Sequence, residues 1–93
     1  MIACEGERCR VEGALTMANV TTVLEESRRA FQAPRIVVDL AGVTEVDSAA
    51  LSLLLEWRRI AAAEKRAIEY TNLPQSLRTL ADLYGISELL PAS

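Results

Sequence analysis

The 93-residue chain is long enough for one domain with a modest hydrophobic core, and we expect a single domain over residues 1–93. About half of the residues are hydrophobic but few are aromatic, so the core should consist mainly of Leu, Val, Ile and Ala. A net charge of −3, without any run of like charges, argues against a nucleic-acid-binding surface and against a basic helix lying on a membrane.

The N-terminal segment indicates a β-hairpin. Residues 2–5 and 8–12 are predicted strands joined by a tight turn at residues 6–7. In the second strand, Cys9 and Val11 alternate with charged residues, which is typical of a strand with one face in water.

Cys4 and Cys9 are the only cysteines, and the chain has no histidine. These are too few ligands for a metal site, and we predict neither a metal nor a cofactor. The N-terminus lacks an apolar signal segment, and no apolar run approaches the roughly 20 residues that span a membrane. We therefore predict a cytoplasmic protein with no direct membrane insertion. Both thiols should then be reduced and packed in or near the core, with a hairpin disulfide as the alternative.

The next segment indicates a helix followed by a strand. After a loop at residues 13–15, a helix is predicted over residues 17–31 with Thr16 as its N-cap. Pro34 stops this helix. The unbroken β-branched run at residues 36–38 predicts a strand buried on both faces.

A turn at residues 41–42 and a polar segment precede a leucine-rich helix predicted over residues 48–63. At helical spacing its core face should consist of Ala50, Leu53, Leu54, Trp57 and Ala61. The opposite face carries Ser48, Ser52, Leu55, Glu56 and Arg59, with Leu51 at its flank. Leucines that are not needed by the core, beside a helix start, are a candidate docking patch.

The C-terminal third predicts one more strand and helix. The strand should cover residues 67–71, and Pro74 suits the first position of a helix. The inner face of that helix should consist of Leu77, Leu80, Ala81 and Tyr84. Gly85 suits its C-cap, and residues 87–90 are a candidate further turn. The order ββαβαβα, with helical crossovers between parallel strands, predicts an α/β fold in which helices cover a four-stranded mixed sheet.

The groups that catalysis needs are missing, and we predict that the chain is not an enzyme. Without histidine a Ser-His-Asp triad is excluded, and no glycine-rich phosphate loop is present. Asp39 and Asp47 are the one conceivable carboxylate pair, but nothing in the pattern places a substrate between them. A small enzyme or ligand carrier with a pocket near Asp39 and Ser48 is therefore the weakest of three hypotheses.

Ser48 has two compatible interpretations. In the first it is a helix cap, worth about 1 kcal/mol. In the second its hydroxyl is displayed to a partner and is a candidate phosphosite. A phosphate there would be stabilised by the helix dipole and free N–H groups. It would also repel an acidic partner or draw Arg59 across. The local pattern favours the cap.

Residues 38–51, Val-Asp-Leu-Ala-Gly-Val-Thr-Glu-Val-Asp-Ser-Ala-Ala-Leu, resemble the signature of STAS domains, the sulfate-transporter and anti-sigma-factor-antagonist module. That signature is Asp-Leu-Ser-x-Val followed by Asp-[Ser/Thr]-small-Gly-Leu. Residues 11–15 are also similar to the family's Gly-x-Leu entry into its first helix. Two departures are Ala49-Ala50 in place of the small-Gly pair and Thr16 where many members have Asp. The resemblance implies a STAS fold for nearly the whole chain.

The chain's length and its end, residues 80–86 and Leu89-Leu90-Pro91, are most similar to the MlaB-like subunit of the Mla phospholipid-transport ABC system. This resemblance implies a non-catalytic accessory subunit, held at the inner membrane by its partner, a cytoplasmic ABC ATPase. It would support assembly or activity of the ATPase, and so phospholipid transport and outer-membrane lipid asymmetry. The alternative is an anti-sigma-factor antagonist in which a kinase, the anti-sigma factor, phosphorylates Ser48.

Both branches imply one partner-binding surface, at the start and on the outer face of the central helix. Its predicted residues are Asp47, Ser48, Leu51, Ser52, Leu55, Glu56 and Arg59.

Overall fold

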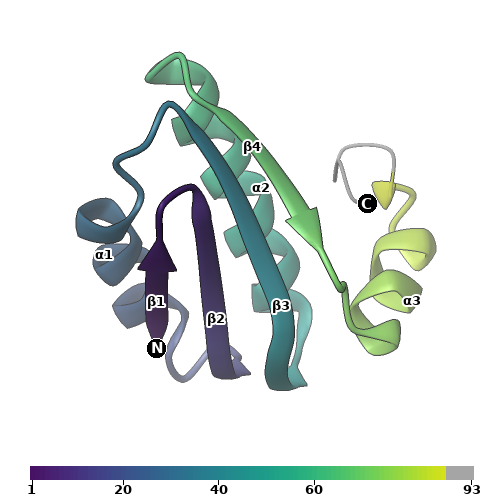
Figure 1. The fold of residues 1–93 in the computed structure, drawn as a ribbon. Coiled ribbons are helices and arrows are strands. Elements are labelled where there is room, and N and C mark those ends of the chain that lie inside the picture. Colours follow the sequence, from purple (N-terminus) through teal and green to yellow (C-terminus); the bar gives the residue numbers. More distant parts are fainter. Residues whose placement is uncertain (88–93) are drawn as a thin grey trace.

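The computed structural model describes residues 1–87 and contains one four-stranded sheet with three helices (Figure 1). In chain order the elements are β1 (Ile2–Glu5), β2 (Arg8–Leu15), α1 (Val20–Ala30), β3 (Arg35–Val46), α2 (Ser48–Ala63), β4 (Ala67–Thr71) and α3 (Gln75–Leu83). The predicted fold class is confirmed. The candidate helical turn at residues 87–90 lies almost wholly outside the described residues.

The strands lie in the order β1-β2-β3-β4, with β1 antiparallel to β2 and the other pairs parallel. The parallel pairs follow from the helical crossovers, since α1 joins β2 to β3 and α2 joins β3 to β4. Figure 1 shows α1 and α2 behind the sheet and α3 beyond the β4 edge. No helix within residues 1–87 is long and apolar enough to cross a membrane.

The core lies between the sheet and α2. The predicted apolar face of α2 is confirmed, because all five of its residues are buried: Ala50, Leu53, Leu54, Trp57 and Ala61. The largest strand residue in the core is Tyr70, whose hydroxyl donates to the Leu54 carbonyl at 2.6 Å. Trp57 Nε1 donates to the buried Ser27 hydroxyl at 2.8 Å, so the indole N–H and the serine hydroxyl satisfy each other inside the core.

The prediction that β3 is buried on both faces is wrong. Alternate residues of β3 face the helices, and those between them face away. Val37 is only half-buried, and Asp39 forms an ion pair with the exposed Arg8 on that side. The apolar run at residues 36–38 suggested two covered faces, but α1 and α2 cover only one.

Both central strands are longer than predicted. β2 includes residues 13–15 and β3 continues through residues 41–42, where a loop and a turn were expected. Their pairing shifts register twice, and these bulges keep the polar segment in the sheet. Gly42 permits the first shift because it has no side chain. A Cβ at this position would lie 2.8 Å from the Glu12 side chain, which is too close.

The helix α1 begins at Val20 rather than at residue 17, and Thr16 is not its cap. The Asn19 side chain instead closes the preceding turn: it accepts from Thr16 N at 2.9 Å and donates to the Ala14 carbonyl at 2.6 Å. Asparagine commonly stabilises such turns through its short side chain. Met17 is thereby left in a loop.

The C-terminal end of α3 matches the prediction for Gly85 but not for Tyr84. Gly85 has a φ of +70°, and its N–H donates to the Asp82 carbonyl at 3.1 Å. The Ile86 N–H donates to the Ala81 carbonyl at 2.9 Å, which completes a Schellman motif. Because regular helix ends at Leu83, Tyr84 turns outward and is 56% exposed.

The expectation that both cysteines are reduced is wrong for this structure, in which Cys4 and Cys9 form a disulfide. The cause is register. The two-residue turn at Gly6-Glu7 places Glu5 opposite Arg8, and therefore Cys4 opposite Cys9.

Candidate partner-binding site

Asp47 holds two distant segments together. It is the N-cap of α2, and its Oδ1 accepts from the Ala49 N–H at 2.8 Å. Its Oδ2 accepts from the Met17 N–H at 3.0 Å, in the loop between β2 and α1. One carboxylate therefore starts the helix and positions the loop beside it.

Ser48 is the first residue of α2 and not its cap, so the favoured interpretation is corrected. Its side chain is exposed, and within residues 1–87 the hydroxyl makes no hydrogen bond. Because Asp47 already satisfies the Ala49 N–H, the helix does not need the serine. The Ser48 hydroxyl is therefore exposed and takes no part in capping the helix.

A groove of about 410 Å³ lies beside Ser48. Its lining comes from the loop before α1, the first turns of α1 and α2, and the segment after α3: Met17, Val20, Ser48, Ala49, Leu51, Ser52, Leu55, Tyr84 and Ile86. The lining is mainly apolar. Met17 and Tyr84 flank it with exposed fractions of 75% and 56%.

Four predicted site residues meet in this groove: Ser48, Leu51, Ser52 and Leu55. Leu51 is 3% exposed and belongs to the core as well as to the floor of the groove. Leu55 is half-buried and also packs against the core. It is therefore less exposed than its predicted position on the outer face of the helix implied. Ser48 and Ser52 are exposed.

Glu56 and Arg59 lie outside the groove and pair with each other. Arg59 Nε and an adjacent guanidinium nitrogen donate to the two Glu56 oxygens at 2.9 and 2.6 Å, and these hydrogen bonds lower the pKa of Glu56. Arg59 stands roughly 16 Å along the helix from Ser48 and lines a second cavity with Trp57. Arg59 is therefore not placed to reach a phosphate on Ser48.

Five residues of the groove were not among the predicted site residues: Met17, Val20, Ala49, Tyr84 and Ile86. The sequence pattern places Met17 in a helix and Tyr84 on the inner face of another. The loop at Met17 depends on Asn19, and the outward turn of Tyr84 depends on where α3 ends. An asparagine just before the helical pattern and a glycine just after it were the available signals.

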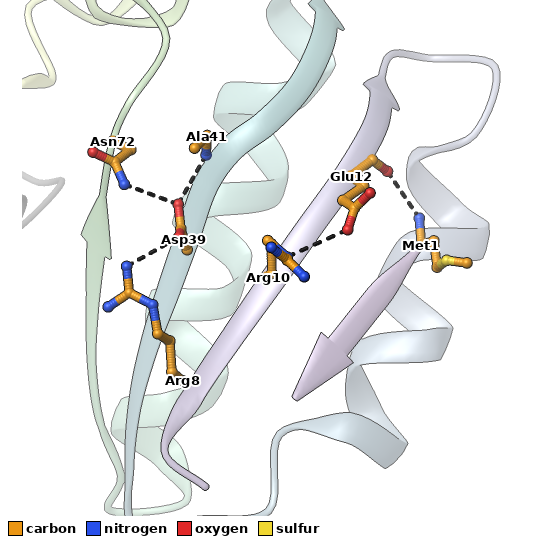
Figure 2. A network of polar contacts seen from close by, with 7 residues as sticks. All are labelled: Met1, Arg8, Arg10, Glu12, Asp39, Ala41 and Asn72. Carbon is orange, nitrogen blue, oxygen red and sulfur yellow. Dashed lines mark hydrogen bonds and ion pairs between the residues drawn. The ribbon is translucent and has the colours of Figure 1, made fainter. Parts of the chain in front are cut away.

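Asp39 and Asp47 do not form a carboxylate pair. Asp39 accepts from Arg8, the Ala41 N–H and Asn72 on the open face of the sheet (Figure 2). Asp47 accepts from two backbone N–H groups at the start of α2. Among residues 1–87, no group of three or more His, Cys, Asp and Glu side chains is placed to hold a metal ion.

We expect Asp47→Ala to destabilise the domain by about 1–2 kcal/mol, because an N-cap and a second backbone acceptor are both lost. Serine also caps helices well, so Asp47→Ser should restore most of this loss. The restoration should be incomplete because serine has a single oxygen on a shorter side chain. Urea unfolding measures both values. Equal loss in the two variants would show that the cap contributes little and that the Met17 bond dominates.

One of the comparisons with known proteins identifies a family. The family model described as "Mlab, STAS domain" matches residues 3–91. Comparison with curated proteins gives no match.

Among solved structures, the chain is similar to the unphosphorylated form of the anti-sigma factor antagonist SpoIIAA. The TM-score is 0.74 at 17% identity, covering 100% of this chain and 86% of the other. An anti-sigma factor antagonist from Mycobacterium paratuberculosis is also similar, with a TM-score of 0.71 at 16% identity, covering 99% and 81%. At these identities the similarity establishes the fold alone.

Proposed function

Because the chain belongs to the Mlab, STAS domain family, we propose that it is a non-catalytic accessory subunit of a phospholipid-transport ABC complex. Its partner in this proposal is the cytoplasmic ATPase subunit, whose assembly or activity it supports. The chain would then lie at the inner membrane through that partner and contribute to outer-membrane lipid asymmetry.

The apolar groove beside Ser48 carries this proposal. Contiguous apolar surface on a small domain commonly marks a protein-binding site. Here Met17 and Tyr84 are large and exposed, and the described residues that line the groove include no charged side chain. A partner segment with two or three apolar side chains would bury this surface, and the serines would hydrogen-bond at its edge. The proposed occupant is such a segment on the ATPase subunit.

Co-expression of the tagged chain with the ATPase subunit of the same organism tests the proposal. We expect a stoichiometric complex by size-exclusion chromatography with light scattering, and a different ATP hydrolysis rate from that of the ATPase alone. The chain by itself should hydrolyse no ATP. Failure to form a complex at micromolar concentrations would contradict the proposal.

The alternative function, an anti-sigma-factor antagonist, is favoured by the exposed Ser48 hydroxyl at the start of α2. If it holds, a partner kinase should add one phosphate per chain at Ser48. The phosphate would bring nearly two negative charges to the rim of the groove, and we expect it to weaken partner binding at least tenfold.

Intact-mass spectrometry after incubation with the kinase measures this phosphate. Ser48→Ala should remove it, whereas Ser52→Ala, one turn along the same exposed face, should retain it. Absence of any phosphorylated form under all growth conditions would contradict the alternative.

A further inference from the structure

The hairpin disulfide lies at the outer edge of the sheet and is far more accessible from one side than from the other. Cys4 and Cys9 face each other across β1 and β2, with their Cα atoms 4.0 Å apart. Cys9 is 1% exposed and belongs to the core, whereas Cys4 is an exposed residue of the edge strand. A small thiol in solution therefore approaches the bond from the Cys4 side.

Little else holds β1 in place. Three of its four residues are exposed, and only Ile2 packs against the core. Beyond the strand pairing itself, Met1 and Glu12 exchange two backbone hydrogen bonds of 2.9 and 3.1 Å at the surface, and Figure 2 shows the one that the Met1 nitrogen donates. The Met1 ammonium also lies 3.9 Å from a Glu26 carboxylate oxygen, an exposed ion pair that contributes little. Segments with few buried apolar contacts open at low free-energy cost. The disulfide is thus the strongest link between β1 and the sheet.

We propose that Cys4–Cys9 is a thiol–disulfide exchange site that fastens β1 to β2 when oxidised and releases it when reduced. The chemical partner is a low-molecular-weight thiol and its disulfide. This inference is independent of the proposed function.

The exchange is a balanced two-electron reaction. The thiolate of a small thiol attacks the Cys4 sulfur, a mixed disulfide forms there, and Cys9 leaves as a thiolate that takes a proton from water. A second small thiol attacks the mixed disulfide and leaves Cys4 as a thiol. Two small thiols are oxidised to one disulfide, and the cysteine pair gains two electrons and two protons. The reverse sequence fastens the strand again.

Release of β1 changes the sheet in a defined way. Residues 8–11 of β2 are paired with β1 on one side, and residues 8–10 are paired with β3 on the other. Without β1 their outer backbone groups form an unpaired strand edge, which is a template for pairing with another strand. The β3–β4 half of the sheet keeps all its partners.

Hydrogen exchange with mass spectrometry, combined with alkylation, tests the proposal on the purified chain in glutathione redox buffers. In millimolar oxidised glutathione we expect no alkylated cysteine, and in millimolar reduced glutathione two. On reduction, amide protection in residues 2–5 and 8–11 should fall roughly 10- to 50-fold, from the closure entropy of so short a loop. Residues 67–71 serve as the internal reference and should not change.

Cys4→Ser is the matched control, because it removes the exposed partner and leaves the buried Cys9 in the core. It should show the low β1 protection of the reduced chain in both buffers. Three results would overturn the proposal: a bond that millimolar reduced glutathione leaves intact, a bond that oxidised glutathione does not form, or reduction that leaves β1 protection unchanged.

Discussion

A Leu55→Asp variant is expected to lose the complex with the ATPase subunit, with an affinity at least about 100-fold below that of the wild type. Leu55 lines the groove one turn beyond Ser52, where the partner's apolar side chains would dock. A carboxylate at this position must give up its water on binding and finds no cation among the residues within 1–87 that line the groove. An uncompensated buried charge costs about 3–5 kcal/mol, which exceeds a 100-fold change in affinity.

The same substitution also affects folding, because Leu55 packs against the core. A loss of about 1–2 kcal/mol of stability is expected, which a 93-residue domain can tolerate. Ser52→Trp separates the two effects. Ser52 is exposed and lines the groove, so an indole there fills the space that a partner needs without altering the core.

Leu83→Asp is the matched control, since Leu83 is 75% exposed and does not line the groove. Calorimetric titration of the ATPase subunit should give wild-type affinity for Leu83→Asp and no measurable binding for Leu55→Asp and Ser52→Trp. Thermal unfolding of each variant confirms that it is folded. Wild-type binding by Ser52→Trp would place the interface elsewhere on the domain.

Elements governed by local pattern could be predicted from the sequence. The bounds of α2 and β4 agree with the predictions, because the leucine spacing and the Asp-Ser start determine α2 locally and the alternation of Ile68 and Tyr70 indicates β4. The ends of β2 and β3 could not be predicted in the same way. Their polar residues remain in the sheet only because the two strands pair with each other through two bulges.

The site was predicted in part for the same reason. The first turns of α2 were identified, but which residue of the Asp47-Ser48 pair caps the helix depends on the Met17 N–H, 30 residues away. Met17 and Tyr84 reach the groove from two other segments, so no local pattern joins them to Ser48. The disulfide was only the alternative prediction, because a cytoplasmic protein favours reduced thiols, although the two-residue turn places the two cysteines opposite each other.

On the open face of the sheet, Asp39 is the residue that connects the strands. The Asp39 carboxylate joins three strands, because it accepts from Arg8 at the start of β2, from the Ala41 N–H in β3 and from Asn72 just after β4 (Figure 2). Its side chain is only 12% exposed, so water cannot readily replace these donors. The Arg35–Glu69 ion pair on the same face is more exposed, at 58% and 35%, and should contribute little.

Asp39→Ala is therefore expected to lower the free energy of unfolding by about 2–4 kcal/mol, since three donors lose a charged acceptor. Asp39→Asn should lose less at pH 7, because its amide oxygen still accepts two of the three bonds while its amide nitrogen faces Arg8. Glu69→Gln is the control and should change stability by less than about 1 kcal/mol. Urea unfolding measures all three.

The pH dependence distinguishes the charge of Asp39 from its shape. The Asn72 hydrogen bond, then the Ala41 N–H, and further the Arg8 guanidinium hold the pKa of the Asp39 carboxyl below its ordinary value of 3.8. The charged form is thus favoured by folding, so its contribution is fully present above that ordinary value and is lost as the pH falls through the lower pKa of the folded state. The stability difference between wild type and Asp39→Asn should be constant from pH 7 to about pH 5 and shrink below pH 3.8. A difference that persists unchanged at acid pH would mean that the hydrogen-bonding shape of the side chain, and not its charge, joins the three strands.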